Sequence, residues 1–181
     1  MDRSDLPPLA AEDHVCDPCG MRFADLTVEQ AGELVAAVPA RARAAVAALE
    51  PARRHGRPSE GVWSAAEYVC HLRDVAMAFT IRLHRVRTED RPALEPVFND
   101  LRARRFRYDD HDVDAVLDQL GIVTPGLLVE AARFSEADWD RTCTRLPHEE
   151  RTARWLLRQA AHEGVHHVAD ITAPCERTSG P

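Results

Sequence analysis

Two histidines and a glutamate near the C-terminal end of the sequence have the spacing of a metal site. They lie in His162-Glu163-Gly164-Val165-His166, an H-E-x-x-H pattern. On a helix, residues four positions apart lie about 40° apart around the axis, so His162 and His166 can bind one ion from the same face. In this pattern the glutamate acts as a general base in metal-assisted hydrolysis. The pattern therefore indicates a metal ion held by two histidines beside a carboxylate that can act as a base.

A peptidase site needs a third protein ligand, and the sequence after the pattern does not supply one. In the extended peptidase pattern a glycine and a further histidine follow, but these positions hold Ala169 and Thr172. An acidic ligand from a later helix would have to be Glu176, which lies too close to His166 in the sequence. A peptidase also usually pairs its substrate with a strand edge, and no segment alternates apolar and polar residues as a strand does. The peptidase interpretation is therefore disfavoured.

A histidine far upstream lies on a helix whose start is well marked. Ser64 and Glu67 form the S-x-x-E pattern of a capping box, and Trp63 and Tyr68 can pack across the helix start. His71 follows two turns into this helix. The apolar residues recur every three or four positions and form one stripe that faces a core: Tyr68, Leu72, Val75, Phe79, Leu83 and Val86. By itself, a histidine beside such a stripe is more often a hydrogen-bonded core residue than a ligand.

The remaining patterns are helical as well. Thr27 and Gln30 form a T-x-x-Q capping box, and the helix after it contains Pro39. The segment 89–110 is rich in arginine, contains two prolines and shows no period, which predicts a long crossover connection. The four helices are expected to begin near Thr27, Ser64, Asp112 and Thr152, with a short helical piece at "SEADWDR" before the last. The predicted fold is all-α, a four-helix bundle around one core.

Together, the patterns on two of these helices resemble those of the DinB superfamily, a group of metal-dependent four-helix bundles. The patterns that carry the resemblance are Trp63-Ser64-x-x-Glu67-x-x-x-His71-Leu72 and, some ninety residues later, His162-x-x-x-His166. The resemblance extends from about Thr27 to Ile171. It implies an up-down-down-up bundle, which agrees with the long crossover connection.

The resemblance also implies one divalent metal ion, held by a histidine of the second helix and two of the last. By position these ligands are His71, His162 and His166, whereas His167 is expected to point away from the ion. Three neutral imidazoles leave the charge of the ion unquenched and one coordination position open, which is typical of a reactive site. Zinc is the first expectation, with nickel, iron and manganese as alternatives. The carboxylates that could orient the rings are Glu67, Asp74, Glu163 and Asp170.

For function, the resemblance implies a small-molecule enzyme. Proteins of this kind include thiol S-transferases that use bacillithiol or mycothiol, and a mycothiol-dependent maleylpyruvate isomerase. All 23 basic residues of the chain are arginine, a composition similar to that of high-GC actinobacteria, where mycothiol is the abundant small thiol. The leading hypothesis is that the metal binds mycothiol or a similar thiol as a thiolate and presents it to an electrophilic small molecule. Arg102, Arg104 and Arg105 could bind polar or carboxylate groups of a substrate, although a solvated loop is the simpler interpretation of these residues.

Two other classes of function remain open. A hydrolase would use the same metal site with a bound hydroxide, and Glu163 or another carboxylate would act as the base. A non-enzymatic metal-binding stress protein would bind the ion and turn over no substrate. Assays with and without a thiol separate these classes.

The N-terminal segment "HVCDPCG" is not accounted for by the resemblance. It places His14, Cys16 and Cys19 close together in an irregular arm. A structural zinc site normally needs four ligands, and the sequence contains only one C-x-x-C. His14 could be a third ligand with a partner elsewhere, or the two thiols could be a redox pair. An incidental pair of reduced thiols is the simplest interpretation.

Composition limits the partners and the location of the protein. The net charge of −7 disfavours nucleic-acid binding, which needs a basic face. No apolar run approaches the roughly 20 residues of a membrane span, and the acidic N-terminus is unlike a secretory signal. We therefore expect a cytoplasmic protein with small molecules as partners. The resemblance to the DinB superfamily adds the expectation that the protein can pair as a homodimer. The expected layout is an arm at 1–26, a bundle at 27–173 and a tail at 174–181.

Overall fold

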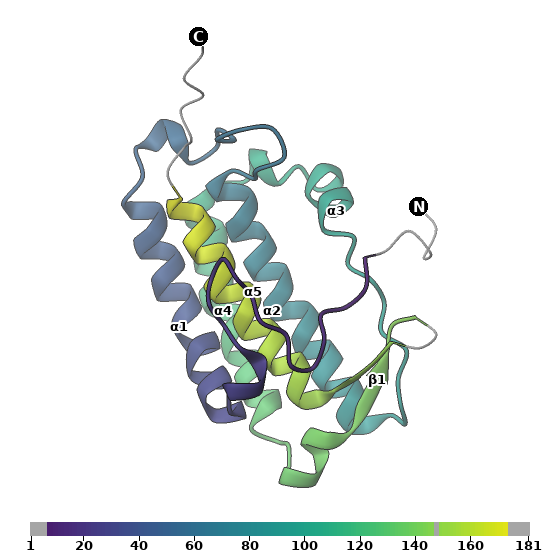
Figure 1. The fold of residues 1–181 in the computed structure, drawn as a ribbon. Coiled ribbons are helices and arrows are strands. Elements are labelled where there is room, and N and C mark those ends of the chain that lie inside the picture. The colour runs from purple at the N-terminus through teal and green to yellow at the C-terminus, as the bar shows by residue number, and fades with distance from the viewer. Residues whose placement is uncertain (1–6, 147–148, 174–181) are drawn as a thin grey trace.

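Four long helices form the body of the protein. The computed structural model describes residues 7–146 and 149–173. The helices are α1 (Val28–Ala47), α2 (Ala65–Thr88), α4 (Val113–Ala131) and α5 (Ala153–Thr172). Helix α2 packs against α4 and α5, and α1 packs against α5 and α4. They run up, down, down and up, so the chain must return along the bundle between α2 and α4 (Figure 1). The predicted four-helix bundle with a long crossover is confirmed, and no described helix is long and apolar enough to cross a membrane.

Side-chain caps fix where the long helices begin. The Ser64 hydroxyl accepts a hydrogen bond from the Glu67 backbone at 3.3 Å, and the Glu67 carboxylate accepts one from the Ser64 backbone at 2.8 Å. The same reciprocal pair starts α1. Asp112 caps α4 and Thr152 caps α5, so all four starts lie where the sequence predicts them.

The two longer connections contain short helices and strands, and the sequence predicts only one of these elements. The crossover carries the short helix α3 (Asn99–Arg105) and a 3-10 helix (Tyr108–Asp110). The connection from α4 to α5 carries the expected short helical piece, a 3-10 helix at Glu136–Asp140, and then an antiparallel hairpin of β1 (Thr142–Thr144) and β2 (Glu150–Thr152). Each strand has 3 residues, which is too short to show an alternating pattern.

The N-terminal arm, residues 7–26, lies along α5 instead of projecting from the bundle (Figure 1). The Trp155 indole donates a hydrogen bond to the carbonyl of Ala11 at 3.1 Å, and Arg158 donates one to the carbonyl of Leu26 at 2.7 Å. Phe23, in a short 3-10 helix of the arm, is completely buried. The arm is irregular, as the sequence predicts, and it is also part of the packed structure.

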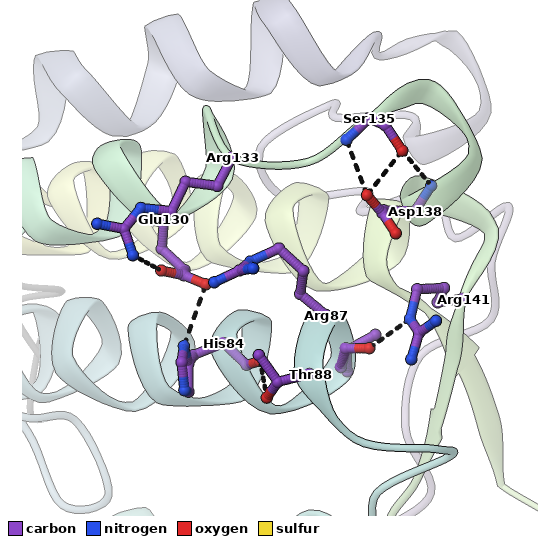
Figure 2. A network of polar contacts seen from close by, with 9 residues as sticks. His84, Arg87, Thr88, Glu130, Arg133, Ser135, Asp138 and Arg141 are labelled. Carbon is purple, nitrogen blue, oxygen red and sulfur yellow. Dashed lines mark hydrogen bonds and ion pairs between the residues drawn. The ribbon is translucent and has the colours of Figure 1, made fainter.

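A buried carboxylate joins α2 to α4 at the end of the bundle near the hairpin. Glu130 is 6% exposed and accepts hydrogen bonds from Arg87 at 2.9 Å and from Arg133 at 3.3 Å. The ring of His84 lies 3.3 Å from the same carboxylate (Figure 2). Removing one partner of such a buried pair is costly, so this cluster fixes how the two parallel helices pack.

Helix α5 carries a glycine where it passes α1. A Cβ atom at Gly164 would lie 2.4 Å from Cγ2 of Val38. Gly164→Ala is therefore expected to lower the free energy of unfolding by about 1–2 kcal/mol, because overpacking outweighs the gain of about 1 kcal/mol in helix propensity. Gly126→Ala on α4 is the matched control, since no atom lies within 4 Å of its Cβ position. In urea unfolding, the free energy of unfolding should fall for Gly164→Ala and rise for Gly126→Ala. Equal changes in the two variants would contradict this packing.

Candidate metal centre

Three side chains from α2 and α5 meet inside the bundle. Nε2 of His71 lies 3.0 Å from Oε2 of Glu163, and Nε2 of His167 lies 3.1 Å from the same oxygen. His71 is 3% exposed, and the other two side chains are half-buried. Glu163 and His167 are four residues apart, so both lie on the face of α5 that packs against α2.

The donor atoms of this group fit a divalent metal ion. Two imidazole nitrogens and a carboxylate oxygen lie within 4.8 Å of one another. Two histidines and one carboxylate are a common ligand set for divalent transition metals, and they leave coordination positions free for a substrate. His71, Glu163 and His167 are thus the residues that would hold the ion.

Neighbouring side chains fix the orientation of the two imidazole rings. Asp170 lies 2.8 Å from Nδ1 of His167, which directs the opposite nitrogen, Nε2, toward Glu163. Tyr68 stacks on the His167 ring at 5.2 Å between centroids, and Trp63 packs edge-on against His71, also at 5.2 Å. A carboxylate behind a histidine ligand is the usual arrangement at metal sites.

In this group, hydrogen bonds shift the pKa values of Glu163 and His167 more than burial does. Burial raises the pKa of Glu163, but hydrogen bonds with His167 and His71 hold this pKa well below its ordinary value. Burial lowers the pKa of His167, but hydrogen bonds with Glu163 and Asp170 leave that pKa above its ordinary value. Glu163 is therefore ionised at neutral pH, and its carboxylate offers a negatively charged oxygen to a bound cation.

A cavity of about 340 Å³ opens beside the group. His71 and Glu163 form part of its wall, and Arg82 of α2 and Arg145 add two cationic side chains. The rest of the wall comes from other residues of α2 and α5, from the crossover, and from the N-terminal arm at Pro7 and Leu9. The cavity is therefore bounded by the metal ligands, by cations and by two segments outside the four long helices.

The structure does not bring His71, His162 and His166 together as one group. His71 lies with Glu163 and His167, whereas His162 and His166 lie with Cys16 and Cys19 in a second group. The sequence "HEGVHH" contains two pairs four residues apart, 162/166 and 163/167, whose faces differ by about 100°. The pattern alone does not show which face meets α2. His167, expected to point away, is the histidine that faces His71.

The four carboxylates expected to orient the rings have different roles. Asp170 does so, and Glu163 is itself a member of the group. Glu67 instead caps α2 and pairs with Arg57. The fourth, Asp74, pairs with arginines and a tyrosine rather than with a histidine.

The other predicted residues are also placed. The ring of His14 packs edge-on against Phe23 at 5.3 Å and against His162 at 5.7 Å, and it is not a member of the second group. Arg104 and Arg105 are exposed on α3, and Arg102 pairs with Asp74. The cavity arginines, Arg82 and Arg145, were missed because they lie on other elements, and only the fold brings them to the site.

The ionised carboxylate of Asp74 makes the stability of the bundle depend on pH. Burial raises its pKa, but hydrogen bonds from Arg102 and Tyr108 and pairing with Arg73 outweigh this and hold the pKa below its ordinary value. A depressed folded-state pKa adds stability above the unfolded value of about 3.9, and that stability is lost as the pH falls through the folded value. Asp74→Asn is therefore expected to cost about 2 kcal/mol at pH 7, and this cost should shrink below about pH 4.

Urea unfolding at the two pH values measures this effect. Asp118→Asn is the control, because that side chain is 72% exposed and its ion pair should contribute little. An Asp74→Asn cost that is the same at pH 7 and at pH 3.5 would contradict the role of the ionised carboxylate.

Comparisons with known proteins agree with this fold. Residues 34–171 match the profile of the DinB superfamily. YfiT from Bacillus subtilis, described as a probable metal-dependent hydrolase with an unusual four-helix bundle topology, has a TM-score of 0.74 at 20% identity, over 80% of this chain and 83% of that chain. A mycothiol-dependent maleylpyruvate isomerase has a TM-score of 0.66 at 19% identity, over 89% of this chain and 67% of that chain. No curated protein matches this sequence.

Proposed function

Because the chain belongs to the DinB superfamily, we propose that it is a metal-dependent enzyme that transfers a small thiol, such as mycothiol, to an electrophilic small molecule. One observation carries the proposal: His71 and Glu163, which form the candidate metal group together with His167, are part of the wall of a cavity of about 340 Å³. A structural metal site would be closed by four protein ligands, whereas this one has three and adjoins a space for substrate.

The protein side chains have distinct parts in this chemistry. A bound divalent ion, with zinc first and iron, nickel or manganese as alternatives, lowers the pKa of a thiol or water that binds to it. Glu163 adds one negative charge that a third imidazole would not add. With an ion bound, Asp170 would accept the proton on Nδ1 of His167 and so leave Nε2 as the nitrogen that binds the ion.

The two cavity arginines suit an anionic substrate group. Arg82 is held by a hydrogen bond to the carbonyl of Glu95 at 3.0 Å and lies over the ring of Phe79 at 4.8 Å. Arg145 is held by Glu149 at 2.9 Å. Guanidinium groups held in this way bind carboxylates with fixed geometry, so we propose that one of them holds a carboxylate of the electrophile or of the thiol.

Hydrolysis is the second candidate, because YfiT, which shares the fold, is described as a probable metal-dependent hydrolase. In that case a water molecule would take the place of the thiol, and Glu163, the carboxylate that contacts both His71 and His167, would be the base. Both candidates use the same residues, so the cosubstrate decides between them.

A thiol-dependence assay tests the proposed function. The metal-loaded protein is incubated with 1-chloro-2,4-dinitrobenzene and a set of ester substrates, with mycothiol, with bacillithiol and without thiol. We expect metal-dependent turnover only with a thiol. With bacillithiol, the cosubstrate of this set that carries carboxylates, KM should rise in Arg82→Ala but not in the exposed-arginine control Arg104→Ala. Ester turnover without a thiol would favour the hydrolase. A metal-loaded protein that turns over neither class would favour a metal-binding protein without catalysis.

A further inference from the structure

We propose that Cys16, Cys19, His162 and His166 bind a structural zinc ion that fastens the N-terminal arm to α5. This site shares no ligand with the group around His71, and the proposal does not depend on which reaction that group supports. The four ligand atoms lie within 4.8 Å of one another. Their spacing, C-x2-C followed by H-x3-H, is that of Cys2His2 zinc sites.

The arm forms a turn that places both thiols on α5. The backbone of Gly20 donates a hydrogen bond to the carbonyl of Cys16 at 2.7 Å, and Cys16 donates one to the carbonyl of Met21 at 2.9 Å. Gly20 has φ +72°, a left-handed conformation that glycine adopts without strain. The chain therefore reverses directly after Cys19, and Val15 and Arg22 pair as an antiparallel bridge. The turn holds the two thiols in place before any ion binds.

The spacing between sulfur and nitrogen fits a shared zinc ion. Sγ of Cys16 lies 3.4 Å from Nδ1 of His166. In a tetrahedral site with Zn–S of about 2.3 Å and Zn–N of about 2.0 Å, the sulfur and nitrogen atoms lie about 3.5 Å apart. Only a small adjustment would be needed for the four atoms to surround one ion.

His162 supplies an independent observation. Both of its ring nitrogens are buried, and neither has a hydrogen-bond partner among the described residues. The rings of His14 and Phe23 pack against it, so its surroundings are largely aromatic. Buried polar atoms are almost always paired, so an imidazole with no partner beside two thiols indicates a missing ligand. A metal ion would supply the partner.

A structural zinc site explains this group better than a redox pair does. A disulfide between Cys16 and Cys19 would use the thiols and leave His162 unpartnered. Four protein ligands with two thiolates complete a tetrahedron, with no position left for a substrate. The ion would instead join the arm to the face of α5 that lies about 100° from Glu163 and His167.

Cobalt substitution in the full-length protein tests the site. Co²⁺ is added to metal-free protein, and the spectrum is recorded for the wild type, for Cys16→Ser with Cys19→Ser, and for Cys143→Ser. Cys143 is the matched control because it is a buried thiol in β1, outside the group. We expect thiolate-to-cobalt charge transfer in the wild type and in Cys143→Ser, and its loss in the double variant, where any remaining d–d bands come from the group around His71.

X-ray absorption on zinc-loaded protein with both cysteines intact does not depend on whether the cysteine variants fold. We carry this out on His71→Ala, in which the other group is disrupted, so that the signal comes from one site. Two sulfur and two nitrogen neighbours, at about 2.3 and 2.0 Å, are expected. A first shell of nitrogen and oxygen alone, or a Cys16–Cys19 disulfide that persists in the presence of zinc, would overturn the proposal. Neither result would affect the proposed function, which is read from thiol-dependent turnover.

Discussion

His71→Ala is expected to remove one of two bound metal equivalents and to lower turnover more than about a hundredfold. Loss of a side chain that merely orients a ligand costs about 10–100-fold in metal affinity or activity, so loss of a ligand should cost more. His71 is the only one of the three donors that comes from α2, and α5 cannot replace it. Elemental analysis and thiol-dependent turnover measure the two losses.

The phenotype of His162→Ala decides between the two arrangements of the histidines. If His71, His162 and His166 held one ion, His71→Ala and His162→Ala would have the same effect. In the structure the two residues belong to different groups, so His162→Ala should remove the thiolate–cobalt signal, whereas His71→Ala should keep it. His167→Ala should behave like His71→Ala.

His84→Ala is the matched control for these variants. It lies on α2 like His71, but it is exposed and its ring contacts Glu130 rather than either metal group. It should retain both metal equivalents and full turnover. A loss of metal in His84→Ala as large as that in His71→Ala would show that general damage to α2 explains the effect.

The sequence predicts the helices because the signals that start them are local. Ser64 and Glu67 lie within one turn, and their reciprocal hydrogen bonds need no other part of the chain. The same holds for Thr27 and Asp112. The long crossover could also be predicted, since a stretch with two prolines and no period cannot be one long helix.

The composition of the metal groups could not be predicted because it depends on the rotation of one helix. Rotating α5 by about 100° would exchange the pair at 162/166 for the pair at 163/167. That rotation is set by packing, including the approach of Val38 to Gly164. The second group could not be predicted for a related reason. Its ligands form two pairs that lie more than 140 residues apart in the sequence, and only the course of the arm brings the pairs together.

Zinc removal is expected to destabilise the protein and to release the arm. With free zinc a thousandfold above its dissociation constant, an ion that binds only the folded state adds about 4 kcal/mol. For a chain of this size that corresponds to roughly 10 °C in Tm. The comparison is best made in a His71→Ala background, because only the proposed zinc site then responds to zinc. His71→Ala alone should gain stability with zinc, and the variant that also carries Cys16→Ser and Cys19→Ser should not. Cys143→Ser in the same background should keep the zinc-dependent gain.

Release of the arm should be visible at Arg22, an exposed residue three positions after Cys19. Trypsin is expected to cleave there faster without zinc, and amide exchange should increase in the turn at Cys16 to Gly20 before it increases in α5. Because Pro7 and Leu9 line the cavity, a released arm should raise KM more than it lowers kcat. If zinc leaves both cleavage and KM unchanged while the cobalt spectrum confirms the site, the ion does not fasten the arm. The hydrogen bonds from Trp155 and Arg158 would then be sufficient to hold it.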